Sequence, residues 1–203
     1  YITYGQFSLA GNPVPALLSG LGSSYGLYAT FTQTFSCGSL LSPGVTCSVD
    51  SISLSLFADI WNGNAANIDT FTGATVATAP TVTDNGGNDV LLGTANLAIT
   101  GLAGINALGG AFENVTTNFL LTTDGANYFT DPVPFYTLAF SNFNNTSQGI
   151  TCDTLGCVNA TRVAINSENG GTDFNRVPEP ATLALMGLGL LGLGASRRRQ
   201  TNV

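Results

Sequence analysis

The chain has 203 residues, of which only 8% are charged: 12 are acidic, five are arginine, and neither lysine nor histidine occurs. Without histidine there is no Ser-His-Asp triad and no His-ligated zinc, and without lysine there is no Schiff-base nucleophile and no P-loop lysine. Hydrophobic residues make up 44% of the chain, which is enough to form a core and excludes bulk disorder.

The acidic residues are concentrated in the first part of the chain. All but one of them precede residue 177, whereas three of the five arginines follow it. Such a surface repels nucleic acid phosphates, so we expect no nucleic-acid partner. It attracts Ca²⁺, which takes oxygen ligands, although negative net charge in most proteins serves solubility alone.

The first segment, residues 1–11, is apolar and has the pattern of a strand. The simpler prediction is that it pairs within its own sheet, as terminal strands often do. The other is that it adds to the sheet of a neighbouring subunit, which would make the protein a pilus-like filament subunit assembled by strand donation. The donor side chains would be Tyr1, Ile2, Tyr4, Phe7 and Leu9.

Apolar and polar side chains alternate with a period of two along much of the chain, as they do in β-strands. The alternation is clear over residues 25–35, and over 45–56 it changes parity near Asp50 and Ser51, which predicts a β-bulge. The glycine-rich residues 101–110 are expected to form a loop or a short helix. Further strands are expected at 115–121, 136–140 and 161–165.

Many short strands separated by turn residues predict an all-β fold, a β-sandwich or jelly-roll-like domain. We place this domain at residues 1–171. No repeat of fixed period occurs, which argues against a solenoid or a propeller.

The four cysteines, Cys37, Cys47, Cys152 and Cys157, are even in number, which favours disulfides in an exported chain. Local pairing, Cys37 with Cys47 and Cys152 with Cys157, is the preferred connectivity of three, because each pair brackets turn residues. A Cys₄ metal site is the alternative, but the spacings differ from the usual zinc knuckles.

Two segments could bind a ligand. The loop from Asp84 to Asp89 gathers oxygen donors, and Asp84, Asn88 and Asp89 could hold Ca²⁺, although the same residue types form ordinary turns. Trp61, flanked by Asp50, Asp59 and Asp69, could stack on a sugar ring as a glycan contact, or it could pack in the core.

The C-terminal residues have three parts. Residues 172–180 read as a linker that ends in Val177, Pro178, Glu179 and Pro180; residues 181–196 are uncharged and apolar; and Arg197, Arg198 and Arg199 follow, within a tail of 181–203. A short membrane helix with a cytoplasmic basic end fits this pattern, because Pro178 and Pro180 suit a position before a helix. The alternative is a buried core helix.

This tail closely resembles the PEP-CTERM protein-sorting signal of Gram-negative bacteria, on the Val-Pro-Glu-Pro motif, the apolar segment and the arginine cluster. The resemblance implies export, retention in the membrane through the C-terminal helix, and cleavage by an exosortase as partner. It also implies localisation at the outer surface or in the extracellular matrix, and an association with exopolysaccharide and biofilm. It covers the tail only.

From these features we expect a structural protein that associates with itself, with no enzymatic activity and no cofactor other than Ca²⁺. The only glutamates before the tail motif are Glu113 and Glu168, and nothing in the sequence places them together as a hydrolase pair. The alternatives are the filament subunit described above and a carbohydrate-binding module.

Overall fold

The computed structural model describes residues 7–9, 12–14, 20–144, 149–166 and 169–175. Within these residues the chain is built from antiparallel strands, with one short α-helix and two 3-10 turns. The all-β class is therefore confirmed. The expected C-terminal helix lies outside the described residues.

A long hairpin forms the centre of the fold. Strands β3 (Tyr25–Cys37) and β4 (Thr46–Ile60) pair along their whole length, because alternating aromatic, aliphatic and hydroxyl side chains suit a pleated sheet. The register shifts where Thr34 pairs with Ser51 but Phe35 pairs with Val49, which leaves Asp50 as the extra residue. The bulge predicted from the change of parity is confirmed.

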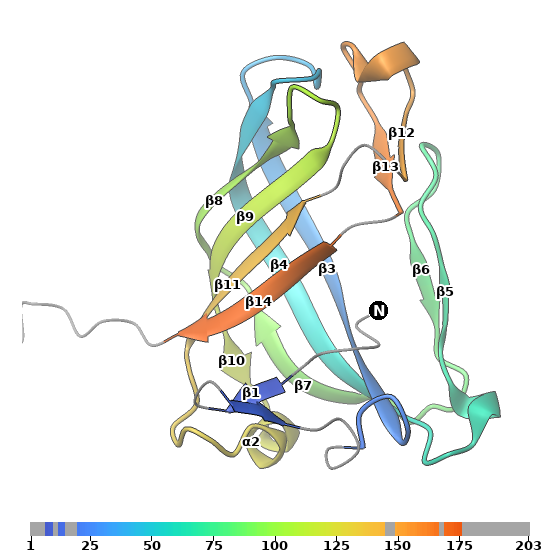
Figure 1. The fold of residues 1–203 in the computed structure, drawn as a ribbon, viewed down its shortest axis with the longest axis vertical. Helices are drawn as coiled ribbons and strands as arrows, with labels where there is room; N and C mark the ends of the chain where they lie inside the picture. The colour runs from blue at the N-terminus through green and yellow to red at the C-terminus, as the bar shows by residue number, and fades with distance from the viewer. Residues whose placement is uncertain (1–6, 10–11, 15–19, 145–148, 167–168, 176–203) are drawn as a thin grey trace, which may run out of the picture.

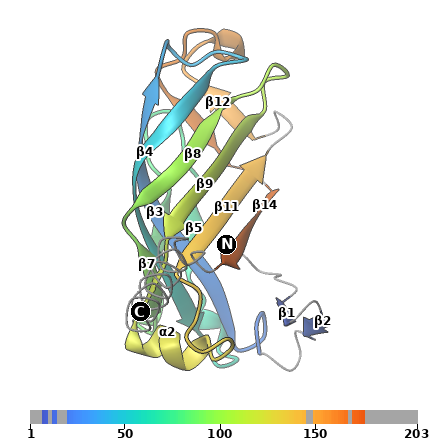
Figure 2. The ribbon, with the colours of Figure 1, turned by 90° about the vertical axis from the view of Figure 1, so that its left-hand side faces the viewer.

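The other edge of β4 is shared between two strands. Its C-terminal half pairs with β7 (Val90–Ala95) and its N-terminal end pairs with β8 (Ala98–Ile105). The eight-stranded sheet then continues through β9 (Ala111–Asn118) and β11 (Leu138–Asn144) to β14 (Asn169–Asn175), while β10 (Leu120–Leu121) pairs with β7. Figure 1 and Figure 2 show that this sheet is strongly twisted.

Strand β8 corrects the expectation of a loop or helix at residues 101–110. Glycine is rare in strands, but here the neighbouring strands come too close for a side chain. A Cβ on Gly101 would lie 2.8 Å from Cβ of Val49, and a Cβ on Gly104 would overlap the carbonyl oxygen of Val45. These glycines therefore permit close strand packing and do not interrupt the strand.

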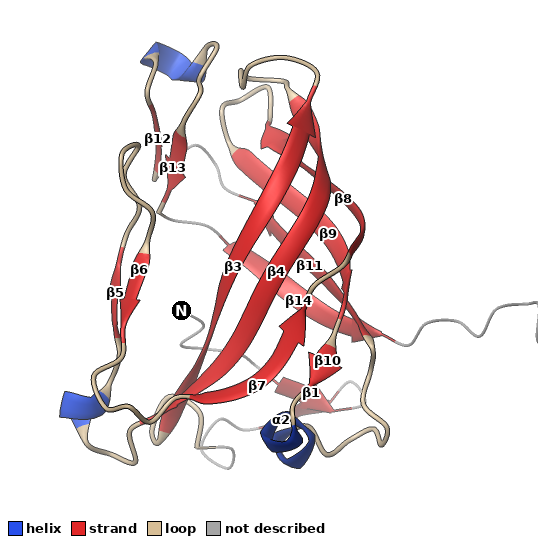
Figure 3. Ribbon diagram, turned by 180° about the vertical axis from the view of Figure 1, so that it is seen from behind, coloured by secondary structure: helices blue, strands red, loops and turns tan. Residues whose placement is uncertain are grey.

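Two small hairpins stand beside edge strand β3, as seen from behind in Figure 3. One consists of β5 (Thr70–Thr72) and β6 (Thr81–Thr83), and follows the 3-10 turn η1 (Ala65–Asn67). The other consists of β12 (Ile150–Cys152) and β13 (Val163–Ile165), with the turn η2 (Leu155–Cys157) between its strands. Asn166 links the two hairpins by donating from Nδ2 to the carbonyl oxygen of Ala74, 2.8 Å away.

Both predicted disulfides are confirmed, Cys37–Cys47 and Cys152–Cys157. The loop that Cys37–Cys47 closes lies against the segment between Cys157 and β13, because Leu41 and Ala160 exchange backbone hydrogen bonds of 3.2 and 2.8 Å. The disulfides thus lie in neighbouring loops that join the β12–β13 hairpin to the main sheet.

The main sheet extends past the predicted end of the domain at residue 171. Strand β14 runs to Asn175, so residues 172–175, assigned to the linker from sequence, are part of the sheet. Residues 172–175 contain few apolar side chains, so no sequence pattern indicated a strand here. In the structure Phe174 packs on Phe119 with ring centroids 4.8 Å apart. Phe129 and Phe135 complete this cluster next to helix α2 (Thr123–Tyr128).

At the N-terminus, β1 (Phe7–Leu9) pairs with β2 (Asn12–Val14) in a separate two-stranded sheet. Of the expected donor residues, Phe7 and Leu9 therefore lie in a hairpin of their own chain. Tyr1, Ile2 and Tyr4 lie outside the described residues.

Candidate metal centre

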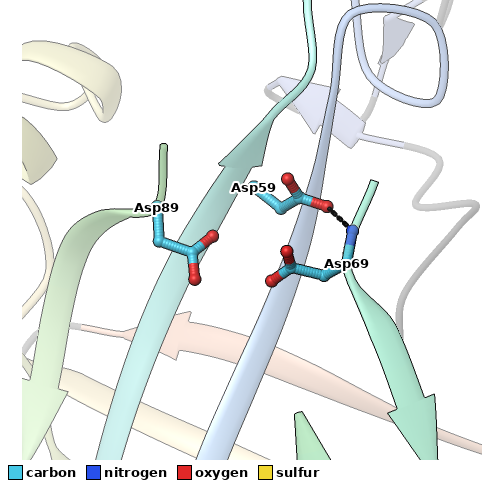
Figure 4. Close-up of side chains that lie close together, drawn as sticks. All are labelled: Asp59, Asp69 and Asp89. Atoms are coloured by element: carbon cyan, nitrogen blue, oxygen red, sulfur yellow. Dashed lines mark hydrogen bonds between the residues drawn. The ribbon is translucent and has the colours of Figure 1, made fainter. Parts of the chain in front are cut away.

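Three aspartates from separate segments converge where the main sheet meets the β5–β6 hairpin. Asp59 is near the end of β4, Asp69 immediately precedes β5, and Asp89 immediately precedes β7. One carboxylate oxygen from each lies within 4.8 Å of the other two. Figure 4 shows the three carboxylates pointing toward one another. We refer to Asp59, Asp69 and Asp89 as the aspartate cluster.

Backbone N–H groups hold the carboxylates of Asp59 and Asp69 in place. Asp59 is 0% exposed, and its Oδ2 accepts a hydrogen bond from the backbone N–H of Asp69 at 3.0 Å. Asp69 is 4% exposed, and its Oδ1 accepts from the backbone N–H of Asn85 at 3.0 Å. The segments before and after the β5–β6 hairpin are therefore held to the end of β4 through these two carboxylates.

Tyr28 on β3 holds the third carboxylate. Its hydroxyl donates to Oδ2 of Asp89 at 2.5 Å, while its ring stacks on Phe57 and meets Phe71 edge-on, with centroid distances of 5.1 and 5.4 Å. Burial and the Asp89 carboxylate raise the pKa of Tyr28, so the hydroxyl stays protonated and acts as the donor.

Asn88 brings an amide to the edge of the cluster. Its Nδ2 donates to the carbonyl oxygen of Ile60 and, at 3.5 Å, contacts Oδ1 of Asp59. The amide oxygen of the same side chain is buried and has no hydrogen-bond partner.

Two carboxylate oxygens in the aspartate cluster are also buried without a hydrogen-bond partner. They are Oδ2 of Asp69 and Oδ1 of Asp89. Most buried polar atoms in proteins are satisfied, so three orphaned oxygens in one place require an explanation.

The electrostatic environment is strongly negative. Burial raises the pKa of Asp59, and the carboxylates of Asp69 and Asp84 raise it further, against the lowering effect of the Asp69 N–H. Burial likewise raises the pKa of Asp89, while the Tyr28 hydroxyl lowers it. In the part of the chain that the structure describes, the only basic side chain is Arg162, which donates to the carbonyl oxygen of Val76 at 3.3 Å.

The sequence-predicted set of Asp84, Asn88 and Asp89 is only partly brought together. Asp89 belongs to the cluster and Asn88 touches it, but Oδ1 of Asp84 accepts from the backbone N–H groups of Gly86 and Gly87, so Asp84 shapes the turn. Asp59 and Asp69 were missed as ligands. An acid inside the apolar end of a strand, as in residues 57–61, was the signal for Asp59.

Trp61 does not have the exposed ring that a glycan contact needs. It is 6% exposed, and its indole N–H donates to the carbonyl oxygen of Ser23 at 2.9 Å. A sugar cannot stack on a ring buried in this way, so the core alternative holds for Trp61.

The comparison with known families concerns the C-terminal tail. Residues 176–199 match the family model of the PEP-CTERM protein-sorting motif. The chain carries a PEP-CTERM sorting motif. The matched PEP-CTERM residues include Val177–Pro180 and Arg197–Arg199, so the resemblance drawn from sequence is confirmed. A PEP-CTERM motif indicates an exported protein that an exosortase sorts to the cell surface.

The PEP-CTERM match covers residues 176–199 and does not extend into the β domain. No curated protein and no solved structure matches the chain. Among the described residues, no helix has the length and apolar character needed to cross a membrane. The expected membrane helix of residues 181–196 lies outside that part of the chain.

Proposed function

We propose that the β domain is a non-enzymatic structural protein of a Gram-negative cell surface or extracellular matrix, which associates with itself and with exopolysaccharide. The PEP-CTERM motif supports the location. The lack of histidine and lysine supports a role without acid–base or nucleophilic catalysis by those residues. The two disulfides suit a domain that works outside the cell.

The observation that carries self-association is the long edge strand β3. Among the described strands it pairs along its length only with β4, and none of its 13 residues is charged. Phe31 and Phe35 on this strand are 53% and 45% exposed. Natural sheets protect such edges with charges, bulges or covering segments, because an unprotected edge pairs with other chains. Tyr28 near the start of β3 meets Phe71 of the β5–β6 hairpin, whereas Phe31 and Phe35 further along the strand are exposed. We therefore propose that the part of β3 that contains Phe31 and Phe35 is the association edge between copies.

Hydroxyl side chains on the β3–β4 hairpin support contact with polysaccharide. Three cross-strand pairs place a threonine opposite a serine, and Thr34 and Ser51 are hydrogen-bonded at 2.6 Å. A row of uncharged donors and acceptors matches the hydroxyl groups of a glycan. The pairs are Thr30–Ser55, Thr32–Ser53 and Thr34–Ser51.

Association through β3 is tested by placing a lysine on the edge. In analytical ultracentrifugation we expect the wild type to form oligomers at high concentration, and Thr32→Lys to shift the distribution to monomers. Asn114→Lys is the matched control, because Asn114 is also exposed but lies on the interior strand β9. Equal oligomerisation of Thr32→Lys and wild type, or a wild type that stays monomeric, would contradict the proposal.

The cellular role is tested in the producing bacterium. We expect deletion of the gene to weaken the biofilm without loss of any enzymatic activity, and deletion of the exosortase to leave the protein in the membrane fraction with its tail intact. A biofilm with unchanged mass and cohesion would contradict the structural role.

A further inference from the structure

We propose that the aspartate cluster, together with the amide oxygen of Asn88, is a calcium-binding site that ties the β5–β6 hairpin to the main sheet. The site lies at the junction of β4, β5 and β7. It goes beyond the structural role proposed above and does not depend on self-association or on polysaccharide.

The spacing of the oxygens suits one Ca²⁺ ion. Ca²⁺ holds its oxygen ligands at about 2.3–2.6 Å, so two ligands of one ion lie at most about 5.2 Å apart. One carboxylate oxygen from each of Asp59, Asp69 and Asp89 lies within 4.8 Å of the other two. A single ion can therefore contact all three residues without rearrangement of the backbone.

The unpartnered oxygens indicate a cation-binding role independently of that spacing. Oδ2 of Asp69 is buried and unpartnered in a residue that is only 4% exposed. Asp89 is half-buried, but its Oδ1 is likewise buried and without a hydrogen-bond partner. The second oxygen of each carboxylate already has a fixed donor, the N–H of Asn85 or the hydroxyl of Tyr28. The protein thus orients both carboxylates and leaves one oxygen on each available.

The negative charge of the aspartate cluster also favours a bound cation. Three carboxylates in close contact repel one another, and a buried anion is costly unless a cation pairs with it. Arg162, the basic side chain of the described region, bonds instead to a backbone carbonyl, that of Val76. A divalent cation would supply the compensating charge.

The donor set selects the kind of cation. Carboxylate and amide oxygens are hard ligands, and the chain has no histidine while its four cysteines form disulfides, so zinc and copper lack their usual ligands. Mg²⁺ requires a tighter octahedron, with ligands at about 2.0–2.1 Å. We choose Ca²⁺ over Mg²⁺ because Ca²⁺ accepts irregular oxygen sets, a choice that export to the cell surface also favours.

The test uses the purified full chain after removal of metal with EDTA. In a calorimetric titration with CaCl₂ we expect one Ca²⁺ per chain, with a dissociation constant at or below about 1 mM, the weakest range of extracellular sites. The melting temperature should rise with calcium concentration, because an ion that binds only the folded state stabilises it. No heat and no shift at about 10 mM CaCl₂, tenfold above that range, would overturn the proposal, and equal or tighter binding of MgCl₂ would overturn the assignment to calcium.

Asp69→Asn locates the site. The asparagine oxygen can still accept the hydrogen bond from Asn85, so the local fold is kept while a charged ligand is lost. We expect at least a tenfold weaker affinity for Ca²⁺, and the same for Asp89→Asn. The matched control is Asp173→Asn, which removes one charge from exposed β14 and should bind Ca²⁺ like the wild type. Wild-type affinity in both cluster variants, or an equal loss in the control, would contradict the site.

Discussion

Gln33 and Glu113 are hydrogen-bonded across the inside of the main sheet, with Nε2 of Gln33 2.6 Å from Oε1 of Glu113. Gln33 belongs to β3 and Glu113 to β9, and β4 and β8 lie between them in the strand order. Side chains on strands so far apart in a flat sheet could not touch, because neighbouring strands are about 4.8 Å apart. The contact shows that the sheet curls strongly, and it places a buried carboxylate inside the curl.

Gln33→Leu should destabilise the protein by about 1–3 kcal/mol, because it removes a donor from a buried carboxylate. Glu113→Gln keeps the shape but removes the charge, and should cost less than Gln33→Leu in urea denaturation. In the double variant Gln33→Leu/Glu113→Leu, part of the loss should be recovered, since the buried carboxylate that accepted from Gln33 is removed together with its donor. Strictly additive free energies of unfolding would show that the two side chains do not interact.

Strands were predictable where side chains alternate, as in β3 and β4, because half-buried strands impose a period of two on the sequence. The bulge at Asp50 was predictable for the same reason. Strand β8 was not predictable, because its glycines are required by the close approach of Val45 and Val49, which are distant in sequence. The extension of β14 to Asn175 was not predicted because backbone pairing with β11, and not an apolar sequence pattern, holds this segment in the sheet.

The candidate site was predictable only in part, since it joins three segments whose proximity depends on the fold. The oxygen-rich loop around Asp89 was visible as a local pattern. In the sequence, Asp59 and Asp69 stand out only as neighbours of Trp61. No local pattern shows that the fold brings Asp89 close to both of them. Local pairing of the cysteines was visible because both disulfides close short loops.

The disulfides should contribute unequally to stability. Cys37 and Cys47 are separated by 10 residues and Cys152 and Cys157 by 5. The chain-entropy model assigns such loops about 2.7 and about 2.1 kcal/mol. Cys47 is also buried in the core, so Cys37→Ala/Cys47→Ala should lose more than Cys152→Ala/Cys157→Ala in urea denaturation. The reverse order would contradict this ranking.

Asp153 should make the β12–β13 hairpin sensitive to acid. The Thr161 hydroxyl lowers the pKa of Asp153, and the backbone N–H groups of Arg162 and Thr161 lower it further. A carboxyl whose pKa is lower in the folded state stabilises that state above its unfolded pKa of about 3.9, and the contribution is lost as the pH falls through the folded pKa.

NMR of the Thr161 amide, which donates to Asp153, can follow this transition. We expect its chemical shift to titrate with a midpoint below about 3.9. Thr161→Val removes the hydroxyl donor and should move the midpoint upward. A midpoint at the ordinary value in wild type, or no movement in the variant, would show that the hydroxyl does not act on Asp153.

Tyr28→Phe separates the hydrogen bond at Asp89 from the proposed ion. The variant keeps the ring against Phe57 and Phe71 but removes the donor to Oδ2 of Asp89. In EDTA we expect a loss of about 1.5–3 kcal/mol, the range for hydrogen bonds to charged groups. Saturating Ca²⁺ should reduce this loss, because the freed Oδ2 of Asp89 can then join Oδ1 on the ion. Urea denaturation of both proteins with and without Ca²⁺ measures the difference, and an equal loss in both conditions would show that the freed Oδ2 of Asp89 does not join the ion.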